Sequence, residues 1–212
     1  MEQKVKPAPE DQIFFVGDLI DRGPRTKDVL DYIIFLSSQE YQIFPLRGNH
    51  EDMCLKALKN ESHLQTWYAN GAKETLRSFG VPEYLIYDAK ALKFIPDNYI
   101  QFMIQLPYYY DLGDFLVVHA GINFENDDIF EDLNAMLWSR KIEYKSKKIG
   151  NRTIIHGHTP MPFVSIRQDI KKQGNKNLNI DAGCVYKDLP GYGILTAIDL
   201  DKKDLLFQEN ID

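Results

Sequence analysis

The chain has 212 residues, of which 44% are hydrophobic and 26% charged, so it is long and apolar enough to form a continuous core. Its 31 acidic and 25 basic residues give a net charge of −6, which disfavours nucleic acid and anionic membranes as partners. Two cysteines exclude a disulfide framework and a zinc ribbon. The absence of a signal peptide and of a membrane-length apolar run predicts a cytoplasmic protein.

Strand and helix patterns alternate along the first half of the chain, which predicts an α/β fold. The expected elements are, in order, a strand at 13–16, a helix at 26–38, a strand at 43–46, an interrupted helix at 51–79 and a helix at 96–105. Thr26 is expected to cap the first helix. The stretch 52–112 contains no strand pattern, and we interpret it as a helical insert that shapes access to the site.

The second half of the chain is expected to consist mainly of strands. The expected elements are strands at 115–118, 153–155, 163–166, 178–180, 194–199 and 205–208, with a solvated hairpin tip at 169–177. Together with the first half, this pattern predicts one domain over residues 1–212, with the helical insert at about 52–112.

Four of the apolar strands end in residues of the metal-ligand types. The four exits are GDLIDRGP (17–24), LRGNHE (46–51), VHAG (118–121) and HGHTP (156–160). Open α/β sheets place their sites at the carboxyl ends of strands. A purely structural interpretation, with turns and core histidines only, would require four independent coincidences. The pattern therefore predicts a metal-dependent hydrolase.

These four motifs resemble the calcineurin-like metallophosphoesterases, in the bacterial form of their phosphoprotein phosphatase branch. Weaker marks of the same branch are Trp67, Asn70-Gly71, Thr75-Leu76, Leu137–Arg140 and Asp181–Cys184. The resemblance extends from about Pro9 onward. It implies a layered α/β/β/α sandwich.

The opening motif of this family, Gly-Asp-x-His-Gly, has no counterpart before Asp18. Its Asp and His bind the first metal, whereas the residues before Gln12 include no histidine. Asp11 lies at the opposite end of the first strand from Asp18, roughly 23 Å away. We therefore expect a fold without its first strand and most of its first helix, one loaded metal, and hydrolysis reduced by orders of magnitude. A natural start upstream of Met1 is the alternative that we favour.

The resemblance implies a ligand set for the second of two metals. Asp18 would bridge both cations, and Asn49, His119 and His158 would complete the second site. Such a mixed oxygen and nitrogen set suits Mn best, with Fe or Zn as alternatives.

The resemblance also implies the residues that act on the substrate. His50 would donate a proton to the leaving group, and Asp21 would orient His50 and raise its pKa. Arg22 would bind phosphate oxygens, and Arg140 is the best candidate for a second phosphate ligand; the alternative for Arg140 is an exposed arginine after a helix. His156 is expected to be a core residue.

The main functional hypothesis is a hydrolase of phosphomonoesters, of the serine/threonine protein phosphatase type, that uses a metal-bound water. An alternative of the same chemistry is a bis(5'-nucleosyl)-tetraphosphatase, in which aromatic residues of 64–112 could stack on a base. A third hypothesis is a catalytically silent remnant or binding module. The expected partner is thus a phosphoprotein or a small phosphoester, and neither nucleic acid nor a membrane.

Overall fold

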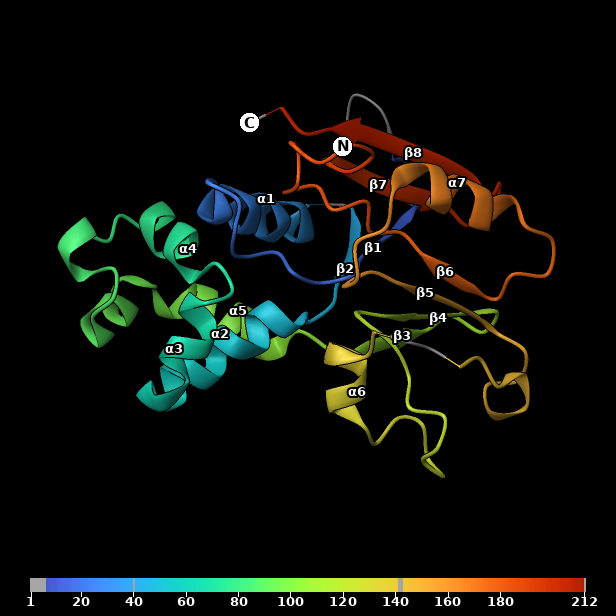
Figure 1. Cartoon of the computed structure of the whole chain (residues 1–212), viewed down its shortest axis with the longest axis horizontal. Coiled ribbons are helices and arrows are strands. Elements are labelled where there is room, and N and C mark those ends of the chain that lie inside the picture. The colour runs from blue at the N-terminus through green and yellow to red at the C-terminus, as the bar shows by residue number, and fades with distance from the viewer. Residues whose placement is uncertain (1–6, 40, 141–142, 212) are drawn as a thin grey trace. The chain divides into compact units, whose positions relative to one another are not determined.

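The structure is a computed structural model that describes residues 7–39, 41–140 and 143–211 (Figure 1). The chain forms two compact units, an N-terminal unit from Pro7 to Pro107 and a C-terminal unit from Tyr108 onward. Each unit contains helices and strands, which confirms the α/β class. Within the described ranges, every helix is too short or too polar to cross a membrane.

The N-terminal unit contains a pair of parallel strands. β1 (Gln12–Phe15) pairs with β2 (Gln42–Pro45), and the register ends with Phe15 opposite Pro45. The rings of Phe14 and Phe44 stack with their centroids 4.9 Å apart. Because the strands are parallel, the residues that follow β1 and β2 leave the pair at the same edge.

Helix α1 (Thr26–Ser38) connects β1 to β2 and has the predicted bounds. Leu30 and Ile33 of this helix are buried, whereas Phe35 is exposed. Thr26 does not cap the helix. Its hydroxyl is buried 3.5 Å from the hydroxyl of Thr75. Thr26 therefore makes a contact with another helix instead of the expected hydrogen bond to the start of its own helix.

The rest of the N-terminal unit is helical, as predicted. Its elements are α2 (Asn49–Lys59), η1 (Glu61–His63), α3 (Leu64–Tyr68), α4 (Ala72–Ser78), η2 (Glu83–Leu85), η3 (Ala89–Phe94) and α5 (Asp97–Gln105). The expected interruption falls at Asn60, whose side chain accepts a hydrogen bond from the backbone N–H of Ser62 and so begins a new turn.

The C-terminal unit contains a four-stranded sheet in the order β3-β4-β5-β6. The strands are β3 (Tyr109–Asp111), β4 (Phe115–Val118), β5 (Thr153–His156) and β6 (Asn177–Asn179). β3 is antiparallel to β4, whereas β4, β5 and β6 are parallel. The remaining elements are α6 (Leu133–Trp138), η4 (Ser146–Lys148), α7 (Phe163–Lys171), β7 (Ile194–Asp199) and β8 (Asp204–Glu209).

Two expectations for the secondary structure are wrong. β3 lies in the stretch 52–112, where no strand was expected; it is only three residues long, and its pairing with β4 stabilises it rather than its own pattern. α7 replaces both the strand expected at 163–166 and part of the hairpin tip. Pro162 precedes this helix, and Ile166 is fully buried on its inner face.

The core of the C-terminal unit holds the ends of β4 and β5 in place. Leu116 and Val118 of β4 pack with Ile154 of β5 and Met136 of α6, and all four are fully buried. The backbone N–H of Ala120 donates to the carbonyl of Met136, which ties the exit of β4 to α6.

Candidate active site

In the N-terminal unit, the first two motifs meet at the edge where β1 and β2 end. Asp18 follows β1, and Asn49 is the first residue of α2, which begins four residues after the end of β2. Asn49 is 3% exposed, and the Asp18 side chain is 27% exposed. The structure thus places a carboxylate and an amide, both predicted metal ligands, on neighbouring loops of one unit.

The carboxylate of Glu51 joins these two loops. Its Oε1 accepts from the backbone N–H groups of Leu19 and Ile20, at 2.7 and 3.2 Å. Its Oε2 accepts from those of Asp18 and Gly48, at 3.0 and 2.7 Å. Glu51 is fully buried. Four backbone donors therefore compensate for burial of its charge, and the carboxylate fixes the loop that carries Asp18.

The approach of the two loops leaves no room for a side chain at residue 48. A Cβ on Gly48 would lie 2.2 Å from Oδ1 of Asp18 and 2.4 Å from its backbone nitrogen. We expect Gly48→Ala to lower the free energy of unfolding by about 3 kcal/mol or more, because backbone must move. Urea denaturation would measure this loss. Gly23→Ala is the matched control, since its Cβ would meet only a carbonyl at 3.9 Å; an equal loss in both variants would contradict the explanation.

His50 and Asp21 form a buried pair. Nδ1 of His50 lies 2.6 Å from Oδ2 of Asp21, and the residues are 2% and 6% exposed. Burial alone would lower the pKa of His50. The hydrogen bond to Asp21 and the carboxylates of Asp18 and Asp21 outweigh burial, so the pKa is raised above its ordinary value.

The other ring nitrogen of His50 faces Asp18. Nε2 lies 3.9 Å from Oδ2 of Asp18, and the backbone N–H of His50 donates to Oδ1 of Asp18 at 3.2 Å. Asp18, Asp21 and Arg22 all have left-handed backbone angles, with φ of 55°, 71° and 62°. Such angles are costly for residues other than glycine and are common at functional loops.

Arg22 is exposed, as a phosphate ligand must be. Its backbone N–H donates to the carbonyl of Gly71 at 3.2 Å. Gly71 has φ of 110°, and a Cβ there would lie 2.7 Å from Cγ of Arg22. The turn between α3 and α4 therefore supports the loop that presents Arg22.

In the C-terminal unit, the third and fourth motifs bring two histidines together. Nε2 of His119 lies 3.2 Å from Nδ1 of His158, and the rings meet edge to face. His119 follows β4 and His158 follows β5, and the N–H of Gly157 donates to the carbonyl of His119 at 2.8 Å. Two imidazole nitrogens that lie this close together are suited to bind the same cation.

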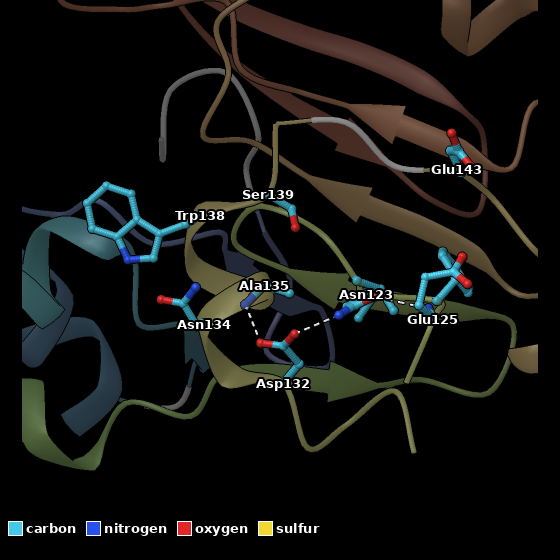
Figure 2. Close-up of a pocket in the computed structure, with 10 residues that line it drawn as sticks. Asn123, Glu125, Asp132, Asn134, Ala135, Trp138, Ser139 and Glu143 are labelled. Carbon is cyan, nitrogen blue, oxygen red and sulfur yellow. Dashed lines mark hydrogen bonds between the residues drawn. The ribbon is translucent and has the colours of Figure 1, made fainter. Parts of the chain in front are cut away.

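Helix α6 ends beside this pair. The ring of Trp138 meets that of His158 edge to face, with centroids 6.0 Å apart. Ser139 and Arg140 follow, and Arg140 is exposed. A pocket of about 520 Å³ lies next to α6. Figure 2 shows its lining residues, among them Asp132, which accepts hydrogen bonds from Asn123 and from the backbone N–H of Ala135.

A smaller pocket, of about 170 Å³, shares Ser139 with the larger one and is lined by Arg140 and His156, among other residues. His156 ends β5 and is 7% exposed, as expected for a core histidine. Burial lowers the pKa of His156 to about 4, and nearby His119 contributes in the same direction. His156 is therefore neutral at pH 7.

The lowered pKa of His156 predicts a loss of stability in acid. The unfolded chain binds a proton near the ordinary pKa of 6.5, and the folded chain does so only near about 4. Folding is thus disfavoured as the pH falls through this window, by about 2 kcal/mol between about pH 7 and about pH 5. His156→Gln should remove this part of the dependence. Urea denaturation of the wild type and the variant, with a chelator at each pH, would give the free energy of unfolding as a function of pH. The same pH dependence in both proteins would contradict the prediction.

The donors in both units fit a divalent transition metal. The N-terminal unit offers carboxylate and amide oxygens, and the C-terminal unit offers two neighbouring imidazoles. Burial raises the pKa of the Cys54 thiol well above its ordinary value, so Cys54 is unsuited to be a thiolate ligand. Oxygen and imidazole donors suit Mn, Fe or Zn.

Sequence reasoning assigned no role to two residues that contact the pair of Asp21 and His50. Trp67 of α3 and Thr75 of α4 both donate hydrogen bonds to Asp21. They were noted only as marks of the family branch. The available signal was chemical: a buried indole N–H requires an acceptor.

The sequence model of the calcineurin-like phosphoesterases matches residues 1–192. The chain therefore belongs to this family of metal-dependent hydrolases of phosphoesters, whose members use two metal ions. The match confirms the class of enzyme predicted from the four motifs.

Curated relatives give a more particular comparison. The chain is 26% identical over 203 residues to bis(5'-nucleosyl)-tetraphosphatase (asymmetrical) of Anoxybacillus flavithermus, covering 88% of this chain and 74% of that protein. It is 26% identical over 199 residues to the protein of the same name from Geobacillus, covering 86% of this chain and 73% of the relative.

Solved structures have the same fold. A candidate diadenosine tetraphosphatase superposes with a TM-score of 0.57 at 19% identity, over 98% of this chain and 84% of the other. A metallophosphoesterase from Sphaerobacter thermophilus superposes with a TM-score of 0.51 at 16% identity, over 95% and 78%.

Proposed function

We propose that this chain hydrolyses dinucleoside tetraphosphates asymmetrically, to a nucleoside triphosphate and a nucleoside monophosphate. The observation that carries this proposal is the match of more than four fifths of the chain to relatives that bear this name. These names favour the nucleotide hydrolase alternative over the protein phosphatase hypothesis.

The pockets of the C-terminal unit also support a nucleotide substrate. Ser139 lines both the pocket of about 520 Å³ and the smaller one, and Arg140 lines the smaller. The larger pocket combines the apolar side chains of Ile122 and Phe124 with the amides of Asn123 and Asn134. Polar residues form most of its lining, so a nucleoside there would be bound mainly through hydrogen bonds, with Ile122 and Phe124 as apolar contacts. A nucleoside there would have its phosphates beside Arg140.

We further propose that Asp18 and Asn49 hold a metal ion together with His119 and His158, the last two from the C-terminal unit. Family membership and the donor types in each unit support this assignment. Bound metals in this family supply an activated water and neutralise charge on the phosphoryl oxygens. Mn suits the donors best.

The chain's own residues would perform the remaining steps. Arg22 and Arg140 would bind phosphate oxygens through paired N–H donors. His50 would donate the proton on Nε2 to the leaving oxygen as the P–O bond breaks, while the proton on Nδ1 stays on the ring and remains hydrogen-bonded to Asp21. His50 is suited to this role because its pKa is raised, which maintains its acid form nearer neutral pH.

A direct comparison of substrates tests the proposal. The protein, supplied with Mn, is incubated with diadenosine tetraphosphate and, separately, with a phosphoserine peptide, and the products are separated by ion exchange. We expect ATP and AMP in equal amounts and little free phosphate from the peptide. Faster release of phosphate from the peptide would favour the protein phosphatase, and two molecules of ADP would contradict asymmetric cleavage. His50→Asn is the matched inactive control.

A further inference from the structure

The carboxylate of Asp21 is held by more than its partner histidine. Its Oδ2 accepts from Nε1 of Trp67 at 2.9 Å as well as bonding Nδ1 of His50 at 2.6 Å. Its Oδ1 accepts from the hydroxyl of Thr75 at 2.6 Å. Trp67 and Thr75 are 0% and 1% exposed, so no solvent competes for these bonds. All four residues belong to the N-terminal unit.

Thr75 holds the backbone of Asp21 as well as its side chain. The hydroxyl accepts from the backbone N–H of Asp21 at 2.8 Å and donates to Oδ1 of the same residue. Asp21 has a left-handed φ of 71°, which is unfavourable unless its surroundings fix it. Two bonds from one hydroxyl therefore fix both the conformation of Asp21 and the plane of its carboxylate.

The hydrogen bonds from Trp67 and Thr75 to Asp21 also determine the orientation of His50. Trp67 occupies one lone-pair position of Oδ2 and Thr75 occupies one of Oδ1, so the second position on Oδ2 accepts the Nδ1 proton of His50. That bond places Nε2 on the opposite side of the ring, toward Asp18. Nε2 is the atom from which a proton would leave for the substrate.

We propose that Trp67 and Thr75 are positioning residues, which direct the proton of His50 to the leaving group through the carboxylate of Asp21. This inference depends on the proposed function in one respect, that His50 acts as the proton donor. In that step a water oxygen forms a bond to phosphorus and releases a proton to solvent, and the bond from phosphorus to the leaving oxygen breaks. The leaving oxygen takes the bonding electrons and the proton from Nε2, and His50 regains a proton from solvent.

The first test needs no catalysis. In metal-free protein with isotopically labelled histidine, the Nδ1 proton of His50 should give a far-downfield NMR signal, because it is buried in a short bond to a carboxylate. His50→Asn identifies the signal. We expect Trp67→Phe and Thr75→Val to shift it upfield or broaden it, and Thr75→Ser to retain it. An unchanged signal in Trp67→Phe and Thr75→Val would overturn the proposal whether or not the protein is a hydrolase.

The second test uses leaving groups of graded basicity. Dinitrophenolate leaves without a proton, whereas phenolate requires one. We expect Trp67→Phe and Thr75→Val to lose about tenfold or more in kcat/KM on phenyl phosphate and less than about twofold on dinitrophenyl phosphate. Thr75→Ser should restore the wild-type ratio. Equal losses on both esters would show a merely structural role and overturn the proposal.

Two further comparisons separate positioning from general damage. In a His50→Ala background, Trp67→Phe and Thr75→Val should cause no additional loss on phenyl phosphate. Thr26→Val is the matched control. The Thr26 hydroxyl is buried 3.5 Å from the Thr75 hydroxyl, and among the described residues it is not one of the hydrogen-bond donors to the carboxylate of Asp21. A selective loss on phenyl phosphate in Thr26→Val would contradict the assignment. Absence of hydrolysis with intact NMR effects would refute the proposed function and leave the hydrogen-bond network supported.

Discussion

Glu51→Gln should destabilise the N-terminal unit by about 3 kcal/mol. The carboxylate of Glu51 is fully buried and accepts four backbone N–H groups, two on each oxygen. The amide of glutamine would place an NH2 group against two of these donors, and the buried position keeps solvent from replacing the lost bonds. The loop that carries Asp18 would lose its attachment to the start of α2.

Urea denaturation would measure this effect, with the fluorescence of Trp67 as the reporter in a Trp138→Phe background. Trp67 lies in the same unit as Glu51, whereas Trp138 lies in the other, so the remaining signal follows the N-terminal unit. Glu83→Gln is the matched control, because Glu83 pairs with Arg77 on the surface and its loss should leave the unfolding midpoint nearly unchanged. Similar midpoints for Glu51→Gln and the wild type would contradict the role of Glu51.

His50→Asn should lower kcat/KM for substrates with basic leaving groups by about a hundredfold to ten-thousandfold. The variant removes the proton donor and retains a side chain of similar polarity. Asp21→Asn should have an effect of the same order, because an amide at this position cannot accept from His50, Trp67 and Thr75 together. The double variant should be little worse than the worse single variant, since the two residues act as a unit.

The pH dependence gives an independent check of this pair. The raised pKa of His50 means that its acid form, and hence proton donation, is retained below that pKa and lost as the pH rises through it. The basic limb of the profile should therefore be absent in His50→Asn. Binding of Mn, measured by calorimetry, should be retained in both variants. Loss of Mn binding, or additive losses in the double variant, would contradict the assignment of His50 and Asp21 as proton donor and orienting acid.

Much of the fold could be predicted because its signals are local. β1, β2 and β4 are apolar runs that end at glycine or at polar residues, and α1 has helical periodicity over its whole length. β3 and α7 were missed for opposite reasons. β3 is too short to show a pattern and forms by pairing with β4. Phe163 and Ile166 are apolar residues in a short segment, where strand and helix periodicity are hard to distinguish.

The chemical groups that the site can use could be predicted from the order of residues alone. Four strand exits carry the carboxylate of Asp18, the amide of Asn49 and the imidazoles of His119 and His158. These residue types at strand ends indicate a metal-dependent hydrolase, and the resemblance of the motifs to a known family adds that the substrate is a phosphoester. The reason is that a parallel strand pair delivers such residues to one edge, whatever the rest of the fold.

The hydrogen bonds that hold His50 and Asp21 in place could be found only in the folded structure. Trp67 and Thr75 lie 46 and 54 residues beyond Asp21 in sequence, yet both donate to its carboxylate. Glu51 likewise bonds a loop more than thirty residues before it. A hydrogen bond over such a separation depends on the placement of helices that no local pattern specifies. The identity of these residues was therefore visible in the sequence, whereas their role depended on packing.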